Sequence, residues 1–396
     1  MNNSNVFKLI FIWYVLPFIF LLCSGIFLPK ILIILSFFFL GFSLSYFSSS
    51  NKHILIPIRV KYFDFIKISK LIVVLSFSLS LYGLIYYFFI VRGRYIDVRE
   101  VYYNGGSVFQ STYIFTFYEI FLTPIIIIVL PILMINKFKN KRIYIFLTLL
   151  FVLIDAFLKQ GRFQILFLFF VIIYYNNYFH IKLKNIIGLG FVLLLFSLYI
   201  FLNRQIPDFS LVKIFNSYNI IDYSYLSKYT INYQVYGYIL LDKFASLNSP
   251  LGNFLEFNSL SFVFYILNTF FFIKLFGFKL DYPWEIYNSK ISLGIFDENF
   301  LLQINAFSTN FYPLYLDGGL LYVFIYGLTS GFIVGVNSDI KFLKILKFLN
   351  FYILIFGLYQ PVITFFIGLI YQILVFILLF YLLKNSALVI AKDFNN

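Results

Sequence analysis

Arginine is scarce in this chain and unevenly distributed. Of its seven arginines, only Arg59 and Arg142 lie in the lysine-rich loops between apolar segments. The other five lie beside the ends of the apolar segments that are away from these loops: Arg92, Arg94, Arg99, Arg162 and Arg204. Arginine binds phosphate and carboxylate through parallel N–H donors and keeps its charge. The five therefore predict an anion-binding site at a membrane surface.

Arg162 has the most informative setting. It ends a very short turn, residues 159–162, between two apolar segments, and Gly161 permits close backbone approach there. Lys159 and Arg162 place two cations where a lipid-linked phosphate would lie, and Arg204 has a similar position where a later segment ends. We expect Arg162 and Arg204 to act catalytically on a lipid-linked pyrophosphate. The expected substrate-binding cations are Lys159, Arg92, Arg94 and Arg99.

Acidic residues offer these cations local partners, which is the alternative to a ligand site. Asp97 and Glu100 are close in sequence to three of the arginines. Glu119 lies near the predicted outer start of one apolar segment, and Asp155 lies near the predicted outer end of the next. Either acid could pair with a cation of that turn, and both could equally serve proton coupling in a transporter.

A second polar cluster, residues 305–319, leads into a late apolar segment. Its Asn and Tyr side chains can hydrogen-bond sugar hydroxyls, and Tyr can stack on a sugar face. The expected sugar-binding residues are Asn305, Asn310, Tyr312 and Tyr315. Asp317 lies about one turn inside the apolar segment, where a charge needs a partner. We expect it to be catalytic, with a structural anchor or helix N-cap as the alternative. Spacing predicts close helix packing at Gly319, Gly327, Gly331 and Gly335.

Other kinds of site are not visible in the sequence. His53 and His180 fall in predicted cytoplasmic loops, so no histidine is available as a base on the outer side. There is no Cys/His cluster and no glycine-rich phosphate loop. We therefore expect no metal, no cofactor and no nucleotide-driven reaction.

The elements that carry these residues are apolar segments. Hydrophobic residues make up 62% of the chain and charged residues only 12%, too little charge for a soluble surface. An apolar segment that crosses a bilayer must satisfy its own backbone hydrogen bonds in lipid, and a helix does so. We expect an all-α, polytopic membrane protein with about 10 (10–12) transmembrane helices, and a single membrane domain over residues 1–396. The expected spans are Val6–Leu28, Ile31–Phe47, Lys70–Val91, Tyr113–Ile135, Ile143–Leu158, Phe163–Phe179, Ile186–Leu202, Phe311–Val336, Phe348–Pro361 and Val362–Leu383. The first is too long for a signal peptide and is interpreted as an uncleaved span.

Lysine and arginine in short loops predict the orientation. The basic loops include residues 48–69, 137–142, 182–184 and 341–347, and all fall on one side if the N-terminus is cytoplasmic. The C-terminus is then cytoplasmic as well. On this topology the formal net charge of +14 lies entirely on the inner side, near anionic lipid, and it does not indicate nucleic-acid binding.

Residues 203–310 interrupt the pattern of spans and are rich in Asn, Ser, Tyr and Asp. We expect them to form one large periplasmic loop. Ser259–Phe278 is apolar, but Asn268 and Lys274 interrupt it, which favours an interfacial or re-entrant helix. Two true crossings, with the other near Tyr229–Leu241, are the alternative.

Together these features resemble Wzy-type O-antigen polymerases, also called oligosaccharide repeat-unit polymerases. The layout of spans, the basic cytoplasmic face and the large late periplasmic loop carry most of the resemblance. Locally, Gly161-Arg162 resembles a Gly-x-Arg or Ser-Arg turn of the family. The stretch 310–319 resembles a motif of the Asp-Phe-Gly type before a late span, although Gly318 replaces the aromatic residue.

The resemblance implies a reaction at the periplasmic face of the bacterial inner membrane. A glycan on undecaprenyl pyrophosphate is transferred to a new lipid-linked repeat unit, as for O-antigen or capsular-type polysaccharide. Outer arginines would stabilise the developing negative charge. Asp297, Glu298 and Asp317 remain open as the base. The implied partners are the undecaprenyl-pyrophosphate-linked oligosaccharide, membrane lipid and a chain-length regulator protein.

Two other functions are the alternatives to a polymerase. An O-antigen ligase uses the same donor, but that family resembles a pattern with a functional histidine in the large outer loop, which this chain lacks. A lipid-linked oligosaccharide flippase or transporter usually has more evenly distributed spans and pseudo-repeats.

Overall fold

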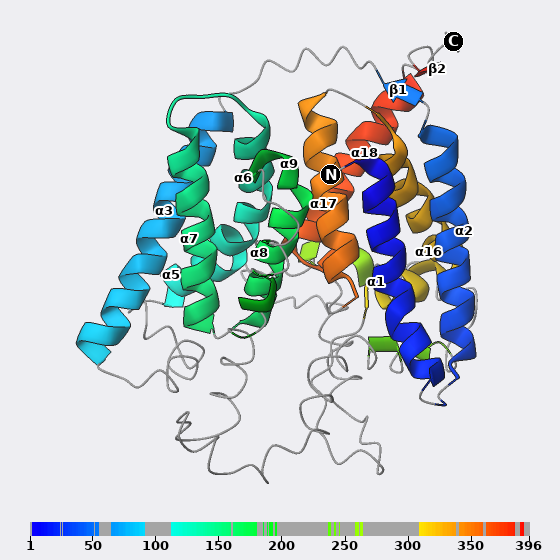
Figure 1. The fold of residues 1–396 in the computed structure, drawn as a ribbon, viewed down its shortest axis with the longest axis horizontal. Coiled ribbons are helices and arrows are strands. Elements are labelled where there is room, and N and C mark those ends of the chain that lie inside the picture. The colour runs from blue at the N-terminus through cyan, green and yellow to red at the C-terminus, as the bar shows by residue number, and fades with distance from the viewer. Residues whose placement is uncertain are drawn as a thin grey trace, which may run out of the picture. The chain divides into compact units, whose positions relative to one another are not determined.

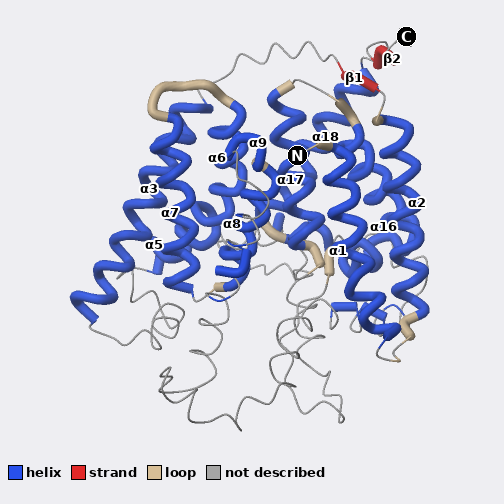
Figure 2. Tube along the Cα trace, viewed as in Figure 1, coloured by secondary structure: helices blue, strands red, loops and turns tan. Residues whose placement is uncertain are grey.

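The computed structural model describes residues 2–23, 25, 27–50, 52–54, 65–91, 112–159, 161–179, 185, 188, 190–192, 195, 237–238, 241–242, 245, 258–260, 262–263, 309–337, 340–358, 362–384 and 389–391 (Figure 1). These residues are helical almost throughout (Figure 2). Apart from turns and short connections, these described residues also include an antiparallel pair of short strands, β1 (Lys52–Ile54) and β2 (Val389–Ala391). The helical fold expected from the apolar segments is thus confirmed.

The chain forms two compact units. Unit 1 contains Ile58–Asp222, and unit 2 contains Asn2–Pro57 together with Tyr223–Asn396. The first two helices therefore pack with the last ones, and the middle of the chain packs with itself. Each candidate site below is formed within one of these units.

Unit 1 is an antiparallel group of helices with two π-helical turns. Its elements are α3 (Phe65–Ile85), the π-helical turn η1 (Tyr86–Val91), α5 (Thr112–Phe117), the π-helical turn η3 (Tyr118–Leu122), α6 (Thr123–Ile135), α7 (Lys141–Lys159), α8 (Arg162–Tyr174) and α9 (Asn176–Phe179). Helix α3 packs against α6 and α7, and α7 packs against α8. Because α5, η3 and α6 follow one another without a break, Thr112–Ile135 runs as one helical stretch with a wider turn at its centre.

Lys70 and Lys141 lie at the same end of this group. The ammonium of Lys70 lies 4.7 Å from the ring centre of Phe138 and 5.4 Å from that of Tyr144. Lys141 lies 4.8 Å from the ring of Tyr178. The first turns of α3 and α7 and the end of α8 therefore share one end, as the loop charges predict. The 159–162 turn is at the opposite end of α7 and α8.

Unit 2 combines the two ends of the chain. Its elements are α1 (Asn3–Cys23), α2 (Pro29–Ser49), β1, the 3₁₀ turn η4 (Asn258–Leu260), α16 (Phe311–Gly335), α17 (Lys341–Phe356), the 3₁₀ turn η5 (Val362–Thr364), α18 (Phe366–Lys384) and β2. One polar network ties several of their ends together. Asn3 donates to the carbonyl of Gly335 at 2.9 Å and accepts from Lys347 at 3.0 Å, while Asn337 donates to the carbonyl of Ser50 at 2.8 Å.

This network and the strand pair place several segments at the same end of unit 2. They are the start of α1, the end of α2, the end of α16, the start of α17 and the C-terminal strand β2. The charge-based topology also assigned these segments to one side.

Helices α2 and α16 pack closely along a glycine seam. A Cβ atom on Gly327 would collide with the carbonyl oxygen of Phe38, and one on Gly331 would collide with that of Phe42. A side chain on Gly335 would likewise meet the last turn of α2. The predicted packing role is confirmed for these three glycines.

Gly319 does not belong to that seam, and here the prediction was wrong. Gly318 and Gly319 have non-helical backbone angles inside α16, and Gly319 has φ 59° and ψ −147°. Only glycine adopts such angles without strain. The expected continuous span over 311–336 is therefore two helical pieces joined at this break.

Part of the predicted periplasmic loop is buried inside unit 2. The hydroxyl of Tyr238 donates to the carbonyl of Tyr14 at 2.8 Å, and Tyr14 is about 13 Å along α1 from its end at Cys23. Asp242 accepts hydrogen bonds from the backbone N–H groups of Lys30 and Ile31 at 2.9 and 3.1 Å. These described residues enter the bundle from the end where α2 begins. Most of 203–310 lies outside the described residues, as does most of the predicted span Ile186–Leu202.

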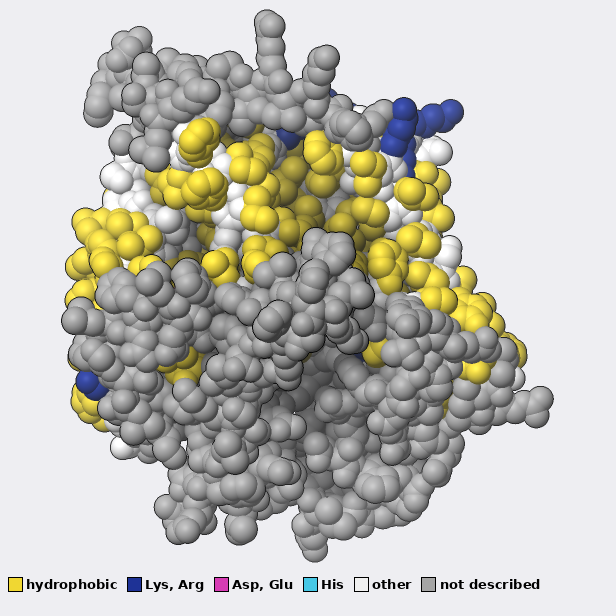
Figure 3. Space-filling model, turned by 180° about the vertical axis from the view of Figure 1, so that it is seen from behind, with side chains coloured by type: hydrophobic (Ala, Val, Ile, Leu, Met, Phe, Trp, Pro, Cys, Tyr) yellow, Lys and Arg dark blue, Asp and Glu magenta, His cyan; other side chains and the backbone are white. Residues whose placement is uncertain are grey.

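The helices have the length and surface of membrane spans. Within the described ranges, five helices are long and apolar enough to cross a bilayer: Asn3–Cys23, Pro29–Ser49, Phe65–Phe89, Tyr118–Ile135 and Phe311–Gly335. Large apolar side chains such as Leu71, Phe89 and Phe376 are exposed, and apolar groups cover much of the described helical surface in Figure 3. Such a surface is unfavourable in water and suited to lipid. The chain is an α-helical, multi-pass membrane protein.

Candidate functional site

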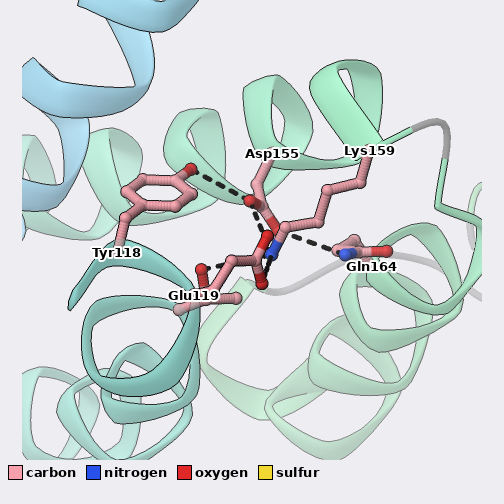
Figure 4. Close-up of polar contacts among 6 residues, drawn as sticks. Tyr118, Glu119, Asp155, Lys159 and Gln164 are labelled. Atoms are coloured by element: carbon pink, nitrogen blue, oxygen red, sulfur yellow. Dashed lines mark hydrogen bonds and ion pairs between the residues drawn. The ribbon is translucent and has the colours of Figure 1, made fainter. Parts of the chain in front are cut away.

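A buried polar cluster lies in unit 1, at the end away from the basic loops. It is formed by Tyr118 and Glu119 of η3, Asp155 and Lys159 of α7, and Gln164 of α8 (Figure 4). Three separate helical segments thus converge on one charged group. Ionisable residues inside membrane segments are costly, and they usually mark functional sites.

Lys159 is the centre of the cluster. Its ammonium lies 3.0 Å from Glu119 Oε2 and 3.0 Å from Asp155 Oδ1. It also donates to the hydroxyl of Thr123 at 3.2 Å. The Lys159 side chain is only 6% exposed. Lys159, predicted to bind substrate, is therefore engaged by two carboxylates, which confirms the pairing that the positions of Glu119 and Asp155 suggested.

Asp155 joins all three segments. Its Oδ1 accepts a hydrogen bond from the Tyr118 hydroxyl at 2.9 Å, and its Oδ2 accepts one from the Gln164 amide at 3.1 Å. The spacing of four residues between Asp155 and Lys159 puts both on one face of α7. With Lys159 on the same carboxylate, Asp155 has donors from η3, α7 and α8, and it is only 1% exposed.

The cluster fixes the turn that precedes Arg162. Gly161 donates its N–H to the carbonyl of Ala156 at 2.9 Å, which closes the end of α7. A Cβ on Gly161 would meet the carboxamide of Gln164, so a larger residue there would displace this side chain from its contact with Asp155. Arg162 is the first residue of α8, and no described side chain caps this helix start. The conformation of the Arg162 side chain lies outside the described part of the structure.

Asp317 belongs to a separate group in unit 2. It is buried and directly precedes the break at Gly318 and Gly319. Its Oδ2 accepts a hydrogen bond from the backbone N–H of Ser259 at 2.8 Å, and Gln372 donates to the carbonyl of Ser259 at 3.0 Å. Asp317 and Gln372 thereby hold η4 against the broken helix. Through this hydrogen bond, Asp317 is anchored to the backbone of Ser259.

Asn310 is a buried connector between helices. Its amide nitrogen donates to the carbonyl of Ile353 at 3.0 Å, and its amide oxygen accepts from the backbone N–H of Ile363 at 3.0 Å. Its own N–H donates to the carbonyl of Gly357 at 2.7 Å. These bonds tie the start of α16 to the end of α17 and to η5. Sugar binding by Asn310 stays a prediction. In the structure, its side-chain amide connects α17 and η5.

The remaining predicted residues fall into two groups. Tyr312 and Tyr315 are buried in the first turns of α16. The others lie outside the described residues: Arg92, Arg94, Arg99, Arg204 and Asn305. Their predicted roles stay predictions.

Sequence reasoning missed two glutamines that organise the two sites. Gln164 and Gln372 lie among mostly apolar residues of a helix, Gln164 in α8 and Gln372 in α18. A polar amide in such a helix is a signal in itself, because it needs a partner in lipid. Among the described residues, no group of three or more His, Cys, Asp or Glu side chains could hold a metal ion.

Comparison of the chain with models of protein families, with curated proteins and with solved structures finds no match.

Proposed function

We propose that this chain is a glycosyltransferase that polymerises lipid-linked oligosaccharide repeat units of the O-antigen or capsular type. It would do so at the periplasmic face of the bacterial inner membrane, with about ten spans, both termini cytoplasmic and residues 203–310 contributing to the outer side. The donor and acceptor would both be undecaprenyl-pyrophosphate-linked oligosaccharides, with a chain-length regulator as a further partner.

The buried cluster around Lys159 carries this proposal. It rigidly positions the backbone at which Arg162 opens α8, through the contacts of Asp155 with Lys159 and Gln164. The start of a helix has free N–H groups and a positive dipole end, both of which favour an anion. Adding the guanidinium of Arg162 suits the turn to a pyrophosphate at headgroup depth.

The chemistry requires little beyond charge stabilisation and a base. A hydroxyl of the acceptor sugar attacks the anomeric carbon of the donor. The bond from that carbon to the pyrophosphate oxygen breaks, and the lipid pyrophosphate leaves with the electron pair. Negative charge grows on the leaving group in the transition state, where a cation such as Arg162 is most effective.

The test is glycan length measured beside the amount of protein in the membrane. Arg162→Ala should lower polymer formation on the order of 10²-fold at normal abundance, because one charge-stabilising donor contributes about that much. Arg162→Lys keeps the charge and loses the two-pronged geometry, so it should remain impaired. The matched control is Arg142→Ala, since Arg142 is exposed in the first turn of α7 at the basic end. Normal polymer from Arg162→Ala would end the proposal.

A flippase or transporter is the second candidate, and the break in α16 favours it. Transporters use interrupted helices beside their binding sites, and Asp317 lies at such an interruption. Deleting the gene separates the two functions. A polymerase deletion leaves exported single repeat units without the long ladder, whereas a flippase deletion removes the exported single units as well. A reporter fused after Lys347 should be cytoplasmic and one near Asn248 periplasmic in either case.

A further inference from the structure

One part-buried lysine of unit 2 is held by a neutral partner. Lys347 lies in the second turn of α17, and its ammonium donates to the Oδ1 of Asn3 at 3.0 Å. Among the described residues, no carboxylate lies within ion-pair distance of Lys347. An ammonium carries a full charge and several N–H donors, so one amide oxygen satisfies it only in part. Lysine is seldom buried without an anionic partner, and Lys347 can take one from outside the chain.

The rest of this polar network is neutral as well. The amide nitrogen of Asn3 donates to the carbonyl of Gly335 at 2.9 Å and to the Oδ1 of Asn337 at 3.0 Å. Asn337 in turn donates to the carbonyl of Ser50. The hydrogen bonds therefore run in one direction, from Lys347 to backbone carbonyls, and they fix how each amide points. No member of this network neutralises the lysine.

Helix dipoles and neighbouring charges leave this end of unit 2 positive. Two helices, α2 and α16, end here and two others, α1 and α17, begin here, so their opposite partial charges offset one another. Lysines outnumber acids in the segments that meet at this end. Residues 3–8, 46–54 and 335–347 contain one acid, Asp339, whose placement lies outside the described residues, and these lysines: Lys8, Lys52, Lys341, Lys344 and Lys347.

An apolar surface begins directly beside this polar network. Phe47 lies one turn before Ser50 in α2 and is 64% exposed, and Leu44, about one turn further into the helix, is 57% exposed. The polar contact between Asn3 and Asn337 is itself at the surface. A ligand that reaches Lys347 from this surface meets polar groups at one end and apolar side chains at the other. This arrangement suits a lipid with an anionic headgroup better than a small soluble anion.

We propose that Lys347 binds the phosphate of an anionic membrane phospholipid, at the end of unit 2 that the loop charges assign to the cytoplasm. The N–H donors of Lys347 that Asn3 does not take bond the phosphate oxygens, and such charge-assisted contacts are stronger than neutral ones. Lys344 is exposed one turn earlier on the same side of α17 and adds positive charge. Because Lys347 also holds Asn3, the bound lipid stabilises the junction of α1, α2, α16 and α17. The site does not depend on the reaction proposed above.

The experiment measures thermal unfolding of the purified full-length protein in a neutral detergent. The probes are phosphatidylglycerol, which has a net negative charge, and phosphatidylcholine with the same acyl chains, which has none. Phosphatidylglycerol should raise the melting temperature by about 2–4 °C more than phosphatidylcholine does, because a ligand bound only by the folded state stabilises it. Equal melting temperatures in the two lipids overturn the proposal. Inorganic phosphate at constant ionic strength should have little effect, and a shift equal to that of phosphatidylglycerol would assign the site to a free anion and overturn the lipid assignment.

Variants assign the effect to Lys347. Lys347→Gln removes the charge and keeps an N–H donor for Asn3, so the difference between the two lipids should disappear, whereas Lys347→Arg should keep it. The matched control is Lys139→Gln, which removes one exposed charge of a basic loop in unit 1 and should also keep the difference.

A lysine with only a structural role would give another result. Lys347→Gln would then melt at a lower temperature in both lipids while the full difference between them remained, and this outcome overturns the site. Native mass spectrometry of the unchanged protein is a second measurement that needs no variant. After partial removal of lipid, phosphatidylglycerol should be retained in preference to phosphatidylcholine, and equal retention would contradict the proposal.

Discussion

Asp242 caps helix α2 at Lys30, although 212 residues separate the two in the chain. Helix α2 begins at Pro29, which suits a first turn but supplies no side-chain cap, and Leu28 before it has none to offer. The Asp242 carboxylate accepts from the N–H groups of Lys30 and Ile31 and faces the positive end of the helix dipole. A segment of the predicted loop thus stabilises the second helix.

The first prediction concerns this cap. Asp242→Ala should lower the free energy of unfolding by about 1 kcal/mol, because capping contacts contribute roughly 0.5–2 kcal/mol. Asp242→Asn keeps an acceptor oxygen and should lose less. Thermal unfolding of the purified protein in detergent measures both variants. An unchanged melting temperature for Asp242→Ala would show that the cap does not contribute.

The second prediction concerns the glycine seam between α2 and α16. A methyl group at Gly331 would meet the backbone of Phe42, which has no room to move. Gly331→Ala should therefore destabilise the protein by roughly 1–3 kcal/mol, the usual cost of overpacking. Gly188→Ala is the matched control, since a Cβ there has nothing within 4 Å. The amount of protein in the membrane reports both, and equal amounts would contradict the close packing.

The third prediction distinguishes the two roles of Asn310. Asn310→Ala leaves the carbonyl of Ile353 and the N–H of Ile363 without these partners, and each buried orphan costs about 1–3 kcal/mol. Membrane abundance should fall, and product length per molecule should not. Normal abundance with shortened glycan would instead support the sugar-binding role predicted from the sequence.

What the sequence could predict depends on how local the cause is. Apolar length predicts where most helices lie, because a helix in lipid satisfies its own backbone. The pairing of Asp155 with Lys159 follows from a spacing of four residues. The grouping of the basic loops follows from charge alone. In these cases the residues that decide the outcome are close in sequence or of one charge type.

The rest depends on contacts that no spacing reveals. The sequence Asp317-Gly318-Gly319 is compatible with a continuous helix that contains small residues and with an interruption of the helix. Only the surrounding packing decides between the two. The contacts of Asp242 with Lys30 and of Tyr238 with Tyr14 join segments more than 200 residues apart. For this reason the sequence predicted an outer loop where part of the segment is buried in the bundle.

The last prediction tests whether Lys159 is an internal counter-ion or a substrate ligand. Removing one partner of a buried ion pair leaves an uncompensated charge and costs roughly 3–5 kcal/mol. Lys159→Met should therefore lower membrane abundance sharply, because Asp155 would be buried without its cation.

The double variant Lys159→Met/Asp155→Asn should recover much of that abundance. The amide that replaces the Asp155 carboxylate would keep an acceptor and a donor in the cluster without a buried charge at that position, and the Glu119 side chain is 25% exposed. The recovery should be specific to this pair, so Lys159→Met combined with Asp242→Asn should stay as low as Lys159→Met alone. A substrate ligand would behave differently: Lys159→Met would then reach normal abundance and lose polymer, and neutralising Asp155 would restore nothing.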